Sequence, residues 1–330
     1  MKLFDVLKQN STAHLVPAAP LGDLNTFGVG GQADLLVVPS SMDDVVVAVQ
    51  ACREHASTLH IMGAGSNIIV PDAGIAGVVL RLPSTAPVCR ADGSWLEAQV
   101  ADGANARVGG LGRIRLAADN WIVGAGVFDP SLAHFAWEHG VTGFEWMYDI
   151  PGSVGGAVFM NAGNNDGEMS HSLVSARWID PQGTLHDWSA DKLAMTYRHT
   201  ILHDQPGVVV EATVRADNSA PKDVILQEMR RIRDLRRSKF PRQLLCAGSV
   251  FKRPSGHYAG KLIEDAGLGG LQVGHAMVAE EHKGFIINLG KASASDLLAL
   301  IEQVQQRVWE NSGIRLETEV ELFGQRPFVG

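Results

Sequence analysis

The sequence predicts an α+β protein with several domains, and three observations lead to this class. The chain has 330 residues, which is more than one hydrophobic core usually accommodates. Residues 33–81 alternate between strand-like and helix-like segments, whereas residues 84–219 are mainly strand-like and rich in turns. The C-terminal part combines helices with short strands. We therefore expect three domains, at 1–83, 84–219 and 220–330.

The composition is that of an ordinary globular protein, with 45% hydrophobic and 19% charged residues. A net charge of -8 argues against a nucleic-acid partner. No apolar run reaches the roughly 18 residues of a membrane span, and the first residues lack a signal-peptide core. Cys52, Cys89 and Cys246 match neither a zinc motif nor a disulfide framework. We expect a cytoplasmic protein that contacts no membrane and contains no metal.

The first part reads as a compact unit of strands around one helix. Residues 33–39 form an apolar strand, and Ser40 or Ser41 can cap a helix over 42–55. A second strand begins near residue 59 and runs into the glycine loop GAGSN, and a third covers 77–82. The prolines in 82–87 end this pattern.

The middle part is predicted to be an antiparallel sheet. Strand-like stretches cover 95–103, 113–127, 175–188 and 207–216, and one helix covers 130–140. The Pro-Gln-Gly turn inside 175–188 suits a hairpin.

The last part begins after a linker at 217–222. A helix over 224–237 has an apolar stripe. After a strand at 284–290, Ser293 and Asp296 form a capping box for a second helix, which Gly313 can end. A final strand over 316–323 would place Glu317, Glu319 and Glu321 on one face. The stripe of the first helix is Ile225, Met229, Ile232 and Leu235; that of the second is Leu297, Ile301, Val304 and Val308.

Three glycine-rich segments are the first candidates for ligand contacts. They are NTFGVGG at 25–31, GAGSN at 63–67 and IPGSVGGAVFMNAG at 150–163. Backbone N–H groups in a loop such as GAGSN suit a pyrophosphate, although that motif alone more often marks a plain tight turn, and NTFGVGG is also explained as a loop that enters a domain. The third holds four glycines and an asparagine, which core packing does not require, so we expect a ligand-contacting loop there.

Single polar residues allow functional and structural interpretations side by side. Arg198 in YRHT can fork onto a carboxylate or phosphate, although most arginines are simply solvated. Ser249 in AGSVFK can donate a proton, although it lacks the hydrolase motif G-x-S-x-G. Spacing alone does not select one carboxylate from Glu317, Glu319 and Glu321. The basic segment RRIRDLRRSK is a solvated face or leads to a phosphate site near Lys239, and Cys246 is a buried thiol or a nucleophile.

Taken in order, eight motifs resemble the UDP-N-acetylenolpyruvoylglucosamine reductase (UDP-N-acetylmuramate dehydrogenase) family. They are NTFGVGG, GAGSN, IPGSVGGAVFMNAG, YRHT, AGSVFKRP, GHYAGKLIEDAGLGG, HKGFIINLG and LETEV. Eight motifs in one order are far more specific than any one of them. The resemblance implies a two-part FAD-binding domain of the vanillyl-alcohol-oxidase type and a C-terminal α+β substrate-binding domain. The chain resembles the shorter branch, which lacks an extra tyrosine-bearing loop.

The resemblance also implies ligands and residue roles. FAD is the cofactor, NADPH the co-substrate and a UDP-sugar the substrate. Arg198, Ser249 and Glu319 are implied as catalytic, and Tyr197, Lys239 and Lys261 as substrate contacts. The implied FAD contacts are Asn25, Thr26, Gly63, Ala64, Gly65, Ser66, Asn67, Pro151, Gly152, Ser153, Gly155, Gly156 and Asn161.

The implied reaction reduces UDP-N-acetylglucosamine enolpyruvate to UDP-N-acetylmuramate, for peptidoglycan precursor synthesis. Hydride passes from NADPH to FAD and then to C3 of the enolpyruvyl group. Arg198 would neutralise the charge that develops on the substrate carboxylate, and Glu319 would act beside it as a proton-bearing group or an orienter. Ser249 would protonate C2.

Two stretches depart from the family pattern. Asn164-Asn165-Asp166 replaces the usual Ala-Tyr-Gly, and 88–115 is longer. Two alternatives are a related flavin oxidase of another substrate and a non-catalytic flavin-binding paralogue. The C-terminal serine and glutamate motifs argue against the first, and the intact Arg198, Ser249 and Glu319 argue against the second. We expect a monomer.

Overall fold

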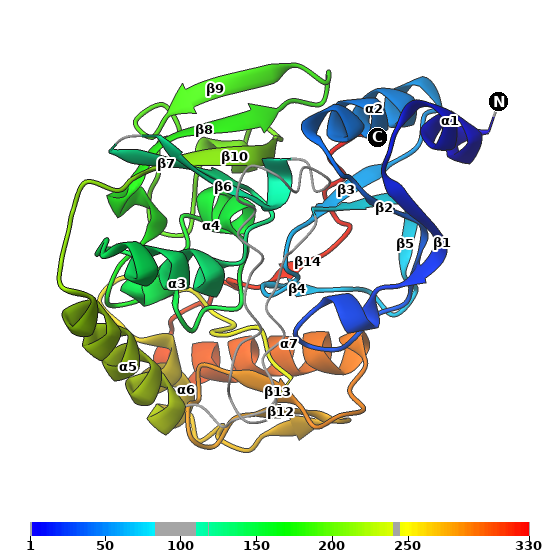
Figure 1. Cartoon of the computed structure of the whole chain (residues 1–330). Helices are drawn as coiled ribbons and strands as arrows, with labels where there is room; N and C mark the ends of the chain where they lie inside the picture. The colour runs from blue at the N-terminus through cyan, green and yellow to red at the C-terminus, as the bar shows by residue number, and fades with distance from the viewer. Residues whose placement is uncertain (1, 83–109, 118, 240–244, 330) are drawn as a thin grey trace.

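A computed structural model describes residues 2–82, 110–117, 119–239 and 245–329. Two larger sheets lie side by side, and a C-terminal unit of helices and short strands lies against them (Figure 1). Some of the sequence predictions fall outside the described residues: the strand at 95–103, the boundary at 83/84, Cys89 and most of the long stretch 88–115. The α+β class is confirmed.

The first sheet has four strands around the predicted helix. Its order is β1-β2-β5-β3, in which β1 is antiparallel to β2 and the other neighbours are parallel. Ser41 caps α2 by accepting a hydrogen bond from the Asp44 N–H at 3.2 Å, as expected. The sequence patterns missed α1 and β1, since β1 contains two prolines, which only an edge strand tolerates. The elements are α1 (Leu3–Asn10), β1 (His14–Pro20), β2 (Gln32–Val38), α2 (Met42–Glu54), β3 (Leu59–Met62) and β5 (Ile75–Arg81).

The second sheet has five antiparallel strands in the order β6-β7-β10-β8-β9. The predicted helix and hairpin are both confirmed. Gly140 ends α3 in the left-handed conformation (φ 67°). The elements are β6 (Ile114–Ala117), β7 (Asn120–Gly124), α3 (Asp129–His139), α4 (Val154–Met160), β8 (Leu173–Ile179), β9 (Leu185–Ser189) and β10 (Val208–Arg215).

Half of the third glycine segment is a helix rather than a loop, which corrects the expectation for 150–163. Residues Val154–Met160 form α4, and the Gly155 N–H donates to the Ala125 carbonyl at 2.8 Å. A Cβ at Gly155 would lie 2.8 Å from the Ala125 Cβ. Gly155 therefore lets α4 pack closely against the backbone that follows β7.

The C-terminal elements agree with the capping predictions but not with every packing prediction. The capping box of α7 is present, Gly313 ends that helix (φ 69°), and its predicted apolar stripe is buried. Leu235 of α5 is 43% exposed, so the predicted stripe of that helix is one residue too long. The elements are α5 (Lys222–Lys239), α6 (Ala259–Asp265), β11 (Gln272–Val273), β12 (Ala276–Val278), β13 (Ile286–Asn288) and α7 (Ala294–Ser312).

The predicted final strand over 316–323 is largely wrong. Only β14 (Glu321–Leu322) is a strand, and it pairs in parallel with β4 (Ile68–Ile69). The preceding residues lie along 250–252 instead: the Glu319 N–H donates to the Val250 carbonyl at 2.7 Å. The segment changes partners within a few residues, so no long ladder forms. The alternation still holds for burial, since Leu316 and Val320 are buried.

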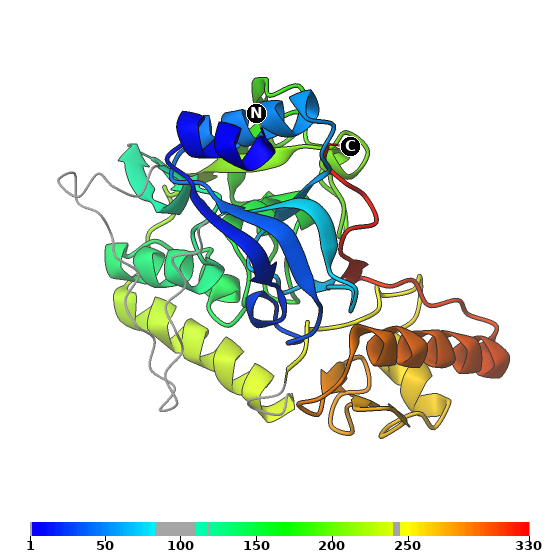
Figure 2. The ribbon, with the colours of Figure 1, turned by 90° about the vertical axis from the view of Figure 1, so that its right-hand side faces the viewer.

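One large hydrophobic core joins the two larger sheets and also takes in Ile225 and Met229 of α5. A separate core lies beneath α7. In Figure 2, α7 and the short strands lie below the two larger sheets. No helix of the described part of the chain is long and apolar enough to cross a membrane.

Candidate active site

A cleft of about 1900 Å³ lies between the two larger sheets and the C-terminal unit. Its walls include the GAGSN loop, the start of α4 and the two C-terminal segments that carry Ser249 and Glu319. The three parts of the chain therefore contribute to one cavity, which is large enough for a dinucleotide and a second ligand.

The GAGSN loop offers free backbone donors to this cleft. Among the described residues, no hydrogen bond is donated by the backbone N–H of Gly63, Ala64, Gly65 or Ser66. Gly65 has φ +73°, and a Cβ there would lie 2.2 Å from the Leu24 carbonyl oxygen. A concave row of unpaired N–H groups suits the pyrophosphate of a dinucleotide, which favours the functional interpretation of this loop.

The facing wall comes close to this loop. A Cβ on Gly63 would lie 2.7 Å from the Ser153 Oγ. That hydroxyl is buried and has no hydrogen-bond partner among the described residues. An unpaired buried hydroxyl between two glycine loops fits a polar ligand that enters between them.

Asp129, which the sequence patterns did not single out, lies in the same wall. Its side chain is 1% exposed, and neither carboxyl oxygen has a hydrogen-bond partner among the described residues. Burial raises the pKa of the Asp129 carboxyl well above its usual range. A Cβ on Gly152 would lie 2.1 Å from its Oδ2, so only glycine fits over this acid. No local pattern marks a buried acid in the first turn of a helix, where aspartate is common.

Arg198 and Glu319 form an ion pair in the cleft. The Arg198 Nε donates to the Glu319 Oε1 at 2.6 Å, and the two side chains are only 14% and 16% exposed. The other guanidinium nitrogens donate to the carbonyls of Asn161 and Gly163. The Asn67 side chain donates to the Glu319 carbonyl at 2.9 Å, which ties this pair to the GAGSN loop.

Two opposing effects act on the pKa of the Glu319 carboxyl. Burial raises this pKa, while the charges of Arg198 and Lys252 and the hydrogen bond from Arg198 lower it; the net shift is upward. The group therefore titrates closer to neutral pH than an ordinary glutamate does, which suits a residue that shares a proton with its surroundings. Burial raises the pKa of Glu321 as well, so the ion pair with Arg198 is what distinguishes Glu319 from Glu317 and Glu321.

Ser249 lies beside this pair because its neighbour Val250 pairs with Glu319. Ser249 is exposed and lines the cleft. The structure therefore brings Arg198, Ser249 and Glu319 into one cavity from three distant parts of the sequence.

Two of the three expected substrate contacts line the cleft. Tyr197 lines the cleft and accepts a hydrogen bond from the Arg253 N–H at 3.3 Å. Lys261 also lines it, but its ammonium group pairs with Asp265 at 2.8 Å and Glu264 at 3.3 Å. Lys239 ends α5, and its side chain lies outside the described residues.

Three expected FAD contacts do not line the cleft: Asn25, Thr26 and Asn161. The Asn25 side chain donates to the Leu21 and Val29 carbonyls, each at 2.8 Å. The Thr26 N–H donates to the Gly65 carbonyl at 3.0 Å. These hydrogen bonds shape and brace the glycine loops. All the other expected FAD contacts line the cleft.

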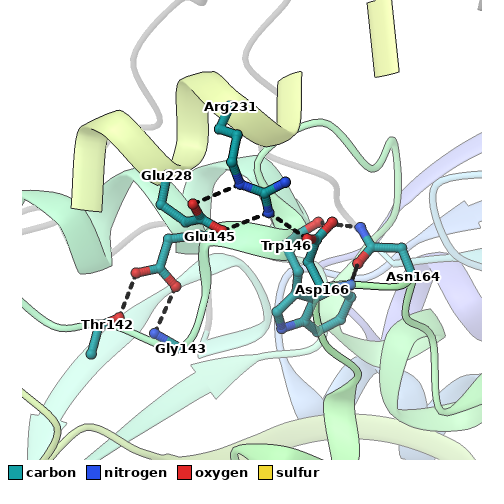
Figure 3. Close-up of polar contacts among 8 residues, drawn as sticks. All are labelled: Thr142, Gly143, Glu145, Trp146, Asn164, Asp166, Glu228 and Arg231. Carbon is teal, nitrogen blue, oxygen red and sulfur yellow. Dashed lines mark hydrogen bonds and ion pairs between the residues drawn. The ribbon is translucent and has the colours of Figure 1, made fainter. Parts of the chain in front are cut away.

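The unusual Asn164-Asn165-Asp166 turn lies at the cleft edge and is tied to its neighbours (Figure 3). Asn164 donates to the Trp146 carbonyl at 3.1 Å, and Arg231 reaches from α5 to Asp166 while also pairing with Glu228. The Glu145 carboxylate is not part of this link, because it accepts hydrogen bonds from the Thr142 hydroxyl and the Gly143 N–H. Asp166 in this turn therefore connects the turn with α5.

Comparisons with known proteins agree with this geometry. Residues 240–323 match the C-terminal domain of UDP-N-acetylenolpyruvoylglucosamine reductase, and residues 105–189 match an FAD binding domain. The chain is 40% identical to the UDP-N-acetylenolpyruvoylglucosamine reductase of Clostridium perfringens over 93% of this chain and 92% of that protein. It is 36% identical to that of Bacillus subtilis over 98% of each.

A solved structure gives the same result. The crystal structure of the Thermus caldophilus reductase superposes with a TM-score of 0.74 at 32% identity, covering 94% of this chain and 98% of that one. Sequence relatives that match nearly end to end, an FAD-binding segment and a shared three-dimensional structure lead to one conclusion: the chain belongs to the UDP-N-acetylenolpyruvoylglucosamine reductase family.

Proposed function

We infer that this protein catalyses the NADPH-dependent, FAD-mediated reduction of UDP-N-acetylglucosamine enolpyruvate to UDP-N-acetylmuramate, a step of peptidoglycan precursor synthesis. The observation that carries this inference is the largely buried Arg198–Glu319 pair. It lies in the same cleft as Ser249 and the free N–H groups of the GAGSN loop, in a member of this family.

The residues present fit FAD. The unpaired N–H groups of Gly63 to Ser66 suit its pyrophosphate, and the orphaned Ser153 hydroxyl faces the same gap. When bound, FAD supplies the redox chemistry by accepting a hydride from NADPH and returning it to the substrate. We propose that 1–83 and 84–219 hold the flavin, and that 220–330 supplies most contacts to the UDP-sugar, including Lys239 and Lys261.

Arg198 is proposed to stabilise the negative charge that develops on the substrate. A hydride that arrives at C3 of the enolpyruvyl group pushes charge toward the carboxylate. A guanidinium already fixed by Glu319 and two carbonyls needs no reorganisation when that charge appears, and such preorganisation is usually the largest catalytic contribution. Tyr197 packs against this guanidinium, whose central carbon lies 5.0 Å from the ring centre.

Ser249 is proposed to deliver the proton to C2. A hydroxyl is a weak acid, so it protonates only a strongly basic carbon and only when it is well placed. The pairing of Val250 with Glu319 supports this role, because it sets the serine beside the pair that binds the carboxylate. Glu319 orients Arg198 and can share a proton with the site. We further propose a cytoplasmic location and a monomeric state.

A two-step anaerobic experiment tests the function. Purified protein with bound flavin should be reduced by NADPH, and added UDP-N-acetylglucosamine enolpyruvate should reoxidise it. Reoxidation by that substrate with formation of UDP-N-acetylmuramate is the expected result. A flavin that only oxygen reoxidises, while the enolpyruvyl sugar has no effect, would contradict the assignment and favour an oxidase of another substrate.

A further inference from the structure

Glu168 is an ionised residue behind Arg198 that lies outside the cleft lining. Its Oε1 accepts hydrogen bonds from the Ser170 hydroxyl at 2.5 Å and from the Asn161 side-chain amide at 3.2 Å. Burial raises the pKa of the Glu168 carboxyl, but these two hydrogen bonds and the charges of His171 and Arg198 outweigh burial and leave it below its usual value. Glu168 is therefore a fixed carboxylate at neutral pH.

Asn161 connects this carboxylate to Arg198. Its side chain is fully buried and all its polar atoms are used: the amide donates to Glu168 and to the Thr196 carbonyl at 3.0 Å, and its oxygen accepts from the Ser170 N–H at 3.0 Å. The Asn161 backbone carbonyl accepts from the Arg198 Nη1 at 3.4 Å. One residue thus holds both the guanidinium and the start of the turn that carries it.

That turn is strained, so it needs such support. The Thr196 N–H donates to the His199 carbonyl at 2.9 Å, which closes a tight turn with Arg198 at φ 55°. An arginine in the left-handed region costs about 1–2 kcal/mol and persists only where the surroundings enforce it. Without the Asn161 contacts, we expect the turn to relax and the guanidinium to shift.

We propose that Glu168 is a positioning residue that acts through Asn161 to hold the Arg198 turn and to aim its guanidinium at Glu319 and at the substrate carboxylate. The proposal rests on the function proposed above, because it deepens the role of Arg198. Glu168 itself does not touch the substrate.

Two substitutions break the link at different points. Glu168→Ala removes one of the two acceptors of the Asn161 amide and leaves its bond to the Thr196 carbonyl. Asn161→Gly removes the bridging side chain but keeps the backbone, because glycine adopts the left-handed conformation at φ 44° freely. We expect each variant to lower the rate of flavin reoxidation by the enolpyruvyl substrate about 10-fold to 100-fold, as small misplacements of a catalytic group do. Flavin reduction by NADPH and flavin content should stay near wild type.

The pH dependence distinguishes positioning from a general loss of stability. The cations that face Glu319 are Arg198 and Lys252. Loosening Arg198 removes one of them, so the titration of Glu319 moves to higher pH in both variants. An infrared titration of its carboxyl band, identified by the absence of that band in Glu319→Gln, measures this shift without turnover. The limb of the pH–rate profile that reflects the titration of Glu319 should also move to higher pH.

Matched variants complete the design. Glu168→Gln keeps an oxygen acceptor for Asn161 and should restore most of the rate. The double variant Glu168→Ala/Asn161→Gly should lose no more than Asn161→Gly alone, because Glu168 acts only through the Asn161 side chain. Glu138→Ala, at an exposed site on α3, should behave as wild type.

Wild-type reoxidation rates and an unshifted Glu319 titration in both single variants would overturn the proposal. A wild-type protein that does not reduce the enolpyruvyl sugar would instead refute the function proposed above, and the infrared titration would still decide the role of Glu168.

Discussion

Arg198 and Glu319 are 121 positions apart in the sequence and 2.6 Å apart in the cleft. Each has a structural cost: Arg198 takes a left-handed backbone, and Glu319 is a largely buried carboxylate. Costs of this kind persist where a site requires them. At the residue scale, the site is therefore recognised by side chains that are placed unfavourably and held by several partners.

Ser249→Ala tests the proton donor at this scale. Loss of a positioned general acid should lower the rate of substrate reduction about 100-fold, while flavin reduction by NADPH stays unchanged. Stopped-flow absorbance of the flavin separates the two half-reactions. Ser255→Ala is the matched control, since Ser255 is exposed in the same loop and does not line the cleft. Equal slowing of both half-reactions would argue for a structural role of Ser249.

Asp129→Asn tests the buried acid. The pKa of Asp129 is raised in the folded protein, so its contribution to stability is fully present below the unfolded pKa near 3.8 and is lost as pH rises through the folded pKa. A neutral amide avoids this loss. The variant should therefore unfold at a higher temperature than wild type at pH 7 to 8, and the gain should shrink toward pH 4. Thermal unfolding against pH measures this, and a gain that grows toward acid pH would contradict it.

At the scale of elements, loops between secondary structures carry many of the groups that we propose bind the ligands. The short α4 and the α2 helix are ordinary packed elements, whereas the N–H groups of Gly63 to Ser66, in the loop between β3 and β4, donate no hydrogen bond to any described residue. Rigid strands on both sides fix this loop in place. A loop so positioned can bind a pyrophosphate without having to be ordered first.

Gly65→Ala tests this loop, with Gly313→Ala as its control. Both glycines have positive φ. A Cβ at residue 65 would lie 2.2 Å from the Leu24 carbonyl oxygen, whereas a Cβ at residue 313 would meet no described atom within 4 Å. Gly313→Ala should cost only the backbone strain, about 1 kcal/mol. Gly65→Ala should also displace the loop and abolish retention of FAD, measured as flavin absorbance per protein after gel filtration. Full flavin content in Gly65→Ala would exclude the proposed pyrophosphate cradle.

At the scale of the whole molecule, the last residues of the chain return from the C-terminal unit to the first sheet. The Leu59 backbone exchanges hydrogen bonds with Phe328 at 2.6 Å and with Val329 at 2.8 Å. Phe328 and Val329 are buried in the core that joins the two larger sheets. These residues therefore link the C-terminal unit to the two larger sheets, and we expect the shape of the cleft to depend on this link.

Phe328→Ala tests this link. Removing a buried aromatic ring should lower the free energy of unfolding by about 3 kcal/mol and should weaken flavin retention. Leu289→Ala is the control, because Leu289 is 43% exposed and its loss should change stability by less than about 0.5 kcal/mol. Urea unfolding of both variants gives the comparison. Equal effects would show that the C-terminal segment is not anchored at Phe328.

Local patterns predicted the elements whose ends carry their own signals. Ser41, the Ser293/Asp296 capping box and Gly313 each act within one helical turn, so α2 and α7 were predicted with their ends. The proline-containing β1 and the interrupted final strand were not, because their pairing depends on partners far away in the chain. The pairing of distant segments leaves no local trace.

The sequence by itself determined the α+β class, the capped helices, the family resemblance and the residues Arg198, Ser249 and Glu319 as candidates. Only the tertiary structure decided that these three share one cleft, that the Asn161 carbonyl accepts a hydrogen bond from Arg198, and that a buried acid lies behind Gly152. The physical reason is that caps and turns depend on neighbouring residues, whereas an ion pair or a buried carboxylate depends on which distant segments pack together.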